Sequence, residues 1–199
     1  MKYLGLLATA LISITSFSSS YAQKAQLEPQ YSNEDAREMY VQHGFFEEKG
    51  KSLATNYGVY NCFPVNSRFE VRLNRGMFST DIVATSLKTG QQIVIENPEK
   101  YTKIKTDELL NRMFSEKKKQ VGNHSSAVSQ AINDCRIIKG MTKDEVILAR
   151  GYPPAHVTPS LEMDTWQYWY RRMEYGQVIF KNGKVSDIVK DIQRKIKKK

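Results

Sequence analysis

Alternating apolar and polar positions predict short β-strands in the first half of the chain. Phe69 to Leu73 alternates strictly and is followed by a turn predicted at Asn74-Arg75-Gly76, and the strand-like run Gln92 to Ile95 follows the turn signal Lys88-Thr89-Gly90. Alternation with period two places every second side chain on one face of a strand. Strands of this length separated by turns favour a small antiparallel meander or an SH3-like barrel.

A helix is expected to close this first module, which we assign to residues 36–118. Thr106 can cap the helix, and Asp107 and Glu108 suit the positive end of its dipole. Leu109, Leu110, Met113 and Phe114 would form its apolar face. Residues 119–124 follow as a linker.

The second module, residues 125–190, is predicted to begin with two helices. The first carries Val128, Ala131, Ile132 and Cys135 at helical spacing. The second starts at Thr142, which forms a capping box with Glu145, and Met141 and Val146 occupy the positions of a hydrophobic staple. Gly151 suits a left-handed C-terminal residue, and Pro153-Pro154 forbids continuation. These roles are structural, so this stretch supplies no catalytic residue.

Three strands are predicted after the helices. Trp166, Tyr168 and Tyr170 should face the core, with Trp169 and Arg171 on the surface. Asn182-Gly183 is a strong hairpin signal that pairs Phe180 with Val185. The predicted fold class is therefore α+β, an antiparallel β-module followed by two helices and a three-stranded meander.

A partner-binding surface is expected on this second module. Aromatic residues and arginine are enriched in binding hot spots, and four of them are candidates: Tyr152, Trp169, Arg171 and Arg172. The alternative, that all of them are structural, stays open.

The N-terminus indicates export. A basic residue, an apolar run from Leu4 to Ile14 and the Ser20-Tyr21-Ala22 pattern resemble a cleavable signal peptide over residues 1–22, although an uncleaved anchor is the alternative. No Cys lies at the cleavage site, so we expect no lipid anchor. Residues 23–35 are polar and without periodicity, and are expected to be a disordered lead-in.

Export also bears on the two cysteines. In an oxidising compartment Cys62 and Cys135 are expected to form a disulfide worth about 4 kcal/mol on a chain-entropy model. Two unpaired buried thiols are the alternative.

Most of the net charge of +9 lies at the C-terminus. Residues 181–199 contain eight basic and two acidic residues, so the rest of the chain is nearly neutral. This distribution disfavours a nucleic-acid partner. Ile188, Ile192 and Ile196 at four-residue spacing predict a basic amphipathic helix over residues 186–199, ending in the basic tail 191–199, that can contact an anionic membrane. A solvated tail is the alternative.

No catalytic motif is recognisable. His43, His124 and His156 lack zinc-site spacing, and there is no G-x-S-x-G, P-loop or G-x-G-x-x-G sequence. We therefore expect no metal, no cofactor and no enzymatic activity, although a triad assembled in space stays open.

One set of motifs resembles a known family. The segment Gly140-Met141-Thr142-Lys143-Asp144-Glu145-Val146, the Gly-Tyr-Pro-Pro break, the Trp-x-Tyr strand and the Phe-x-Asn-Gly-Lys-Val hairpin are similar to the SmpA/OmlA (BamE-like) family of Gram-negative outer-membrane assembly lipoproteins. The resemblance covers about residues 125–190. It implies a non-enzymatic ααβββ domain that binds envelope proteins and supports assembly of outer-membrane β-barrels.

Two departures limit the transfer of function, because this chain lacks the family's lipidated Cys and adds residues 36–118. The leading hypothesis is a non-catalytic scaffold or adaptor in the periplasm or at the outer-membrane periphery of a Gram-negative bacterium, with envelope proteins such as the β-barrel assembly machinery as partners. The alternatives are a peptidoglycan-binding protein, whose β-module resembles bacterial SH3 domains, a secreted β-lactamase-type inhibitor, and an unrecognised hydrolase.

Overall fold

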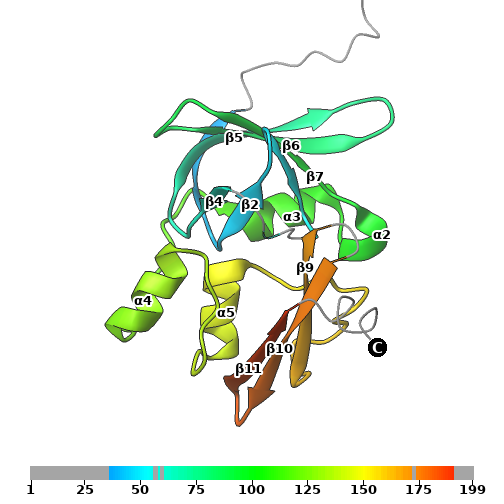
Figure 1. Ribbon diagram of the computed structural model, residues 1–199. Helices are drawn as coiled ribbons and strands as arrows, with labels where there is room; N and C mark the ends of the chain where they lie inside the picture. Colours follow the sequence, from blue (N-terminus) through cyan, green and yellow to red (C-terminus); the bar gives the residue numbers. More distant parts are fainter. Residues whose placement is uncertain (1–35, 56–57, 59–60, 172–173, 191–199) are drawn as a thin grey trace, which may run out of the picture. The chain divides into compact units, whose positions relative to one another are not determined.

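The computed structural model describes residues 36–55, 58, 61–171 and 174–190. The predicted signal peptide, lead-in and basic tail lie outside the described residues. Four helices and three sheets occur in the described part, which confirms the α+β class (Figure 1). None of the helices described is long and apolar enough to span a bilayer.

A six-stranded sheet dominates the first module. Its strands are β1 (Arg37–Val41), β3 (Lys51–Leu53), β5 (Arg68–Arg75), β6 (Thr80–Ser86), β7 (Gln92–Glu96) and β8 (Phe114–Ser115), in the order β3-β7-β6-β5-β1-β8. Two further short strands, β2 (Phe45–Glu47) and β4 (Asn61–Phe63), pair separately.

The prediction of a purely antiparallel module is wrong at one edge, because β3 pairs with β7 in parallel. This pairing joins segments about 40 residues apart in the chain, and Gly50 O and Ala54 N extend it by backbone hydrogen bonds. Period-two patterning identifies a strand but does not specify which edge a short, non-local strand joins.

Two helices close the sheet: α2 (Glu99–Thr102) and α3 (Thr106–Met113). Leu109 and Met113 of α3 are buried in the core beneath the sheet, and both belong to the predicted apolar face of this helix. The predicted cap is wrong, since Lys105 occupies the N-cap position without a side-chain hydrogen bond. Thr106 is instead buried, and its hydroxyl accepts a hydrogen bond from Asn97 Nδ2 at 3.4 Å.

The second module contains α4 (Ser126–Asn133), α5 (Lys143–Arg150), β9 (Thr165–Arg171), β10 (Glu174–Lys181) and β11 (Lys184–Lys190). The element order matches the predicted two helices and three antiparallel strands, and the sheet order is β11-β10-β9. Trp166 and Tyr168 are completely buried in its core with Met141 and Val146, whereas Tyr170 is only half-buried.

The N-terminus of α5 has the predicted capping box. Thr142 Oγ1 accepts from Glu145 N at 3.3 Å, and Glu145 Oε2 accepts from Thr142 N at 2.7 Å. The C-terminus differs from the prediction, because Gly151 has φ 84° and ψ −176° rather than the left-handed helical conformation. That region is essentially restricted to glycine, and in it the Gly151 carbonyl accepts a hydrogen bond from the Tyr168 hydroxyl at 2.9 Å.

The last two strands form the predicted hairpin. Asn182 and Gly183 both have positive φ, and Phe180 pairs with Val185 across the turn. Residues 186–190 continue as β11, so the helix predicted over 186–199 is wrong in this part. β10 offers them a hydrogen-bonding edge and Ile188 packs on the core, which an isolated amphipathic helix could not provide.

Candidate functional site

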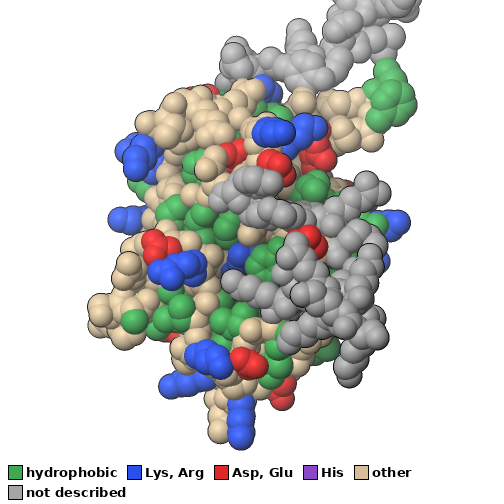
Figure 2. All heavy atoms as spheres, in the orientation of Figure 1, with side chains coloured by type: hydrophobic (Ala, Val, Ile, Leu, Met, Phe, Trp, Pro, Cys, Tyr) green, Lys and Arg blue, Asp and Glu red, His purple; other side chains and the backbone are tan. Residues whose placement is uncertain are grey.

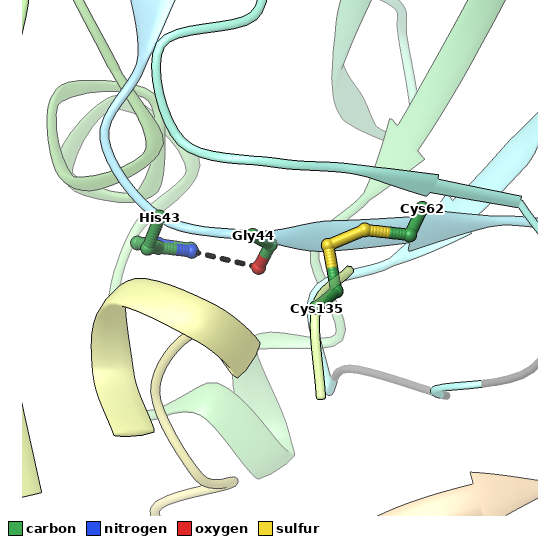
Figure 3. Close-up of a disulfide and its surroundings, with 4 residues drawn as sticks. All are labelled: His43, Gly44, Cys62 and Cys135. Atoms are coloured by element: carbon green, nitrogen blue, oxygen red, sulfur yellow. Dashed lines mark hydrogen bonds between the residues drawn. A yellow bond between two sulfur atoms is a disulfide. The ribbon is translucent and has the colours of Figure 1, made fainter. Parts of the chain in front are cut away.

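A disulfide joins the two modules. Cys62 lies in β4, Cys135 lies just after α4, and their Cα atoms are 6.3 Å apart (Figure 3). The predicted pairing is therefore present, and neither cysteine is a free thiol. Cys135 does not belong to the helix as predicted, since α4 ends at Asn133 and Cys135 has a φ of 52°.

Backbone hydrogen bonds cross the same junction. Gly44 N donates to Leu148 O at 2.9 Å, and His156 N donates to Tyr101 O at 3.1 Å. A Cβ atom at position 44 would collide with the Ala149 carbonyl oxygen, so the close approach of the two modules requires glycine there.

A buried cation also lies between the modules. The guanidinium carbon of Arg150, at the end of α5, is 4.5 Å from the Phe46 ring centroid and 4.7 Å from that of Tyr170. Burial lowers the pKa of Arg150, but contacts with aromatic faces favour a guanidinium. This residue thus ties β2 of the first module to the second.

His43, next to Gly44, is buried with 7% of its surface exposed. Its Nδ1 lies 3.2 Å from Gly44 O, and because a carbonyl can only accept, Nδ1 carries the proton (Figure 3). Burial, together with the charges of Arg112 and Lys119, lowers the pKa of His43 to about 4. The ring is therefore neutral at pH 7, and its Nε2 is a buried acceptor with no protein partner.

His124 has a similar arrangement. Its Nδ1 lies 2.7 Å from Glu145 Oε1. Burial raises the pKa of Glu145, but hydrogen bonds from the Thr142 backbone and from His124 outweigh this, so the pKa lies below its usual value and the carboxylate is ionised. Nδ1 is therefore the donor, and His124 Nε2 is also buried without a protein partner.

Both histidines line one groove between the modules, of about 450 Å³, which we call the junction groove. Arg112 and Lys119 provide its cations and Asp144 its carboxylate, with Tyr152 as an aromatic wall. The Arg112 guanidinium carbon lies 4.7 Å from the Tyr152 ring centroid, and its Nη2 donates to Glu108 at 3.2 Å.

The predicted partner residues fall in different places. Tyr152 lies in the junction groove, where its ring meets His43 edge-on at 5.5 Å. Trp169 is half-buried rather than on the open surface as predicted, because it stacks on His156 at 6.2 Å and meets Tyr175 at 5.8 Å. The side chain of Arg171 and all of Arg172 lie outside the described residues.

The most exposed large hydrophobic residues of the described part of the chain lie elsewhere, at the tip of the β5–β6 hairpin. Met77 is 85% exposed and Phe78 is 96% exposed. Figure 1 shows this hairpin extending beyond the rest of the sheet, and Figure 2 shows the hydrophobic patch at its end. The turn lies at residues 76–79 and not at Asn74–Gly76 as predicted, because Arg75 still pairs with Thr80 across the strands.

A recess lies beside this tip. It is lined by Met77 and Phe78 together with the carboxyl-bearing residues Asp81, Glu96 and Glu99. The hairpin tip, Met77 and Phe78, thus presents an apolar pair next to acidic groups.

In the described part of the chain, no three His, Cys, Asp or Glu side chains are grouped so as to hold a metal ion. Comparisons of the chain with protein-family models, with curated proteins and with solved structures find no match.

Proposed function

We propose that this protein is a non-catalytic adaptor of a bacterial cell envelope that binds a partner protein through the hairpin tip. The exposure of Met77 and Phe78 carries the proposal. Burying such a side chain contributes about 1.5–3 kcal/mol, and adjacent exposed apolar residues of this size mark interaction sites.

A protein suits the tip better than a lipid surface does. Asp81, Glu96 and Glu99 line the recess beside it, and carboxylates are repelled by the anionic headgroups that attract peripheral proteins. A partner with an apolar pocket and basic residues at its rim would complement both features.

The envelope location rests on the signal-peptide pattern of residues 1–22, and the Cys62–Cys135 disulfide is compatible with an oxidising compartment. The resemblance of residues 125–190 to the SmpA/OmlA family favours partners within the β-barrel assembly machinery.

The test is co-purification of the tagged protein from gently solubilised envelopes, with a photo-crosslinking amino acid at position 77. We expect β-barrel assembly components to be recovered with the wild type and lost with Phe78→Ser. Leu87→Ser is the matched control, since Leu87 is 46% exposed in the β6–β7 turn.

Two results would contradict the proposal. Equal recovery of the partner with Phe78→Ser and with wild type would remove the tip from the interface. Sedimentation with phosphatidylglycerol vesicles that Phe78→Ser abolishes would make the tip a membrane contact instead.

A further inference from the structure

We propose that the hairpin tip of one molecule binds in a groove on a second copy of this chain. The groove has a volume of about 470 Å³ and lies at the β6–β7 turn, and we call it the turn groove. The inference shares the tip with the proposed function, but it needs no envelope partner, so the purified chain tests it alone. Three features carry it: the apolar lining of the turn groove, its charge, and its distance from the tip.

The turn groove is an apolar hollow with a packed floor. Phe63 and Pro64 line it and are half-buried, and Leu87 lines it and is 46% exposed. The Phe63 ring lies against the rings of Phe45 and Phe69, with centroid distances of 5.2 Å and 5.1 Å. Because this floor is already ordered by the core of the first module, an incoming side chain pays little ordering cost. A groove of this volume can bury a whole small ligand, so it has room for the two apolar side chains of the tip.

The charges beside the two surfaces are complementary. Arg68 and Lys88 line the turn groove, and no Asp or Glu is among the described residues that line it. The recess beside the tip contains Asp81, Glu96 and Glu99. Arg68, Glu96 and Glu99 already form ion pairs within their own molecule. In the described part of the chain Lys88 and Asp81 form none, so these two charges are left to pair between copies.

The tip and the turn groove of one molecule are too far apart to meet. β6 begins at Thr80, directly after the tip, and ends at Ser86, directly before the β6–β7 turn (Figure 1). Six residue steps along a strand span about 20 Å. The tip can therefore enter a turn groove only on another molecule, in a head-to-tail contact. A tip bound in this way is covered, so self-association and binding of the proposed partner exclude each other.

Sedimentation velocity of the full exported chain from about 10 µM to about 1 mM tests the proposal, because a contact made by one turn is small and therefore weak. We expect the wild type to sediment faster as its concentration rises. Phe78→Ser and Leu87→Ser should each weaken association at least about tenfold, since each removes an apolar contact. Leu161→Ser is the matched control and should associate like the wild type, because Leu161 is 36% exposed and lines neither surface.

A mixture of the two variants distinguishes loss of the contact from loss of folding. Phe78→Ser keeps the turn groove and Leu87→Ser keeps the tip. Their equimolar mixture should therefore form a dimer and nothing larger, although neither variant associates alone at the same concentration. A variant that had failed to fold could not supply its half of this contact.

A charge exchange tests the proposed ion pair between copies. Lys88→Glu and Asp81→Lys should each weaken association about threefold, in line with an exposed ion pair. The double variant restores a pair of opposite charges, so it should associate like the wild type.

The proposal is overturned if the wild type stays monomeric at the highest concentration, if Leu87→Ser associates like the wild type, or if the mixture of variants forms no dimer. A monomeric wild type that still recovers its envelope partner through the tip would remove this inference and leave the proposed function intact.

Discussion

At the scale of single residues, His43 shows how burial sets a charge state. Its native pKa is about 4, against 6.5 for an unperturbed histidine, because burial disfavours the imidazolium. The unfolded chain therefore takes up this proton at a higher pH than the native chain does. The contribution of neutral His43 to the free energy of unfolding is therefore complete above pH 6.5, and it is lost as the pH falls towards 4.

The predicted loss from His43 is about 3 kcal/mol across that interval. Urea unfolding of the wild type and of His43→Gln from pH 7.5 to 4 measures it. Hydrogen bonds lower the pKa of the buried Glu47 carboxylate and outweigh the effect of burial, so its protonation also lowers the free energy of unfolding at acidic pH. This loss is common to both proteins. The free energy of unfolding of the variant should fall less, and parallel curves for the two proteins would show that His43 does not titrate as expected.

At the scale of elements, the capping box of α5 links helix formation to the junction groove. Thr142→Ala removes the acceptor for Glu145 N and should cost about 1 kcal/mol in the free energy of unfolding. Glu145→Gln should cost less, because glutamine can still accept from Thr142 N. Urea unfolding compares the two variants.

The same two variants distinguish the role of Glu145 in the helix cap from its interaction with His124. Glu145→Gln replaces the charged acceptor of His124 Nδ1 with a neutral one, which weakens this hydrogen bond. The NMR resonance of the Nδ1 proton should therefore move upfield in this variant and stay in place in Thr142→Ala. An unchanged His124 Nδ1 proton resonance in Glu145→Gln would show that the two side chains do not interact in solution.

Elements with local signals could be predicted from the sequence, and elements that depend on distant partners could not. The capping box of α5 and the Asn182-Gly183 hairpin are each specified within a few residues. The spacing of Ile188, Ile192 and Ile196 predicts a helix, but residues 186–190 pair with the edge of β10 instead. The parallel β3–β7 pair likewise depends on a segment far along the chain.

At the scale of the whole molecule, the junction groove could not be predicted because its residues are far apart in the sequence. His43, Arg112 and Tyr152 meet only after both modules have folded and joined. Tyr152 is predicted from its residue type alone, whereas the spacing of the histidines carries no signal of a shared site. The hairpin tip had a local signal, since Met77 and Phe78 are large apolar residues within a turn, but misplacing the turn concealed it.

The disulfide gives a prediction about how the modules depend on each other. Cys62 and Cys135 are 73 residues apart, and a chain-entropy model assigns such a crosslink about 4 kcal/mol. The double variant Cys62→Ser/Cys135→Ser should therefore lose about 4 kcal/mol in the free energy of unfolding by urea. Wild-type protein under reducing conditions should match it, and the variant itself should not respond to reductant.

Loss of the disulfide should not separate the modules. The hydrogen bond from Gly44 N to Leu148 O and the packing of Arg150 against Phe46 cross the junction independently of the crosslink. The double variant should therefore still unfold in one transition, with tryptophan fluorescence of the second module and far-UV circular dichroism of the whole chain giving the same midpoint. Two separated midpoints would mean that the disulfide alone couples the modules, and that the non-covalent contacts between the modules are too weak to hold them together.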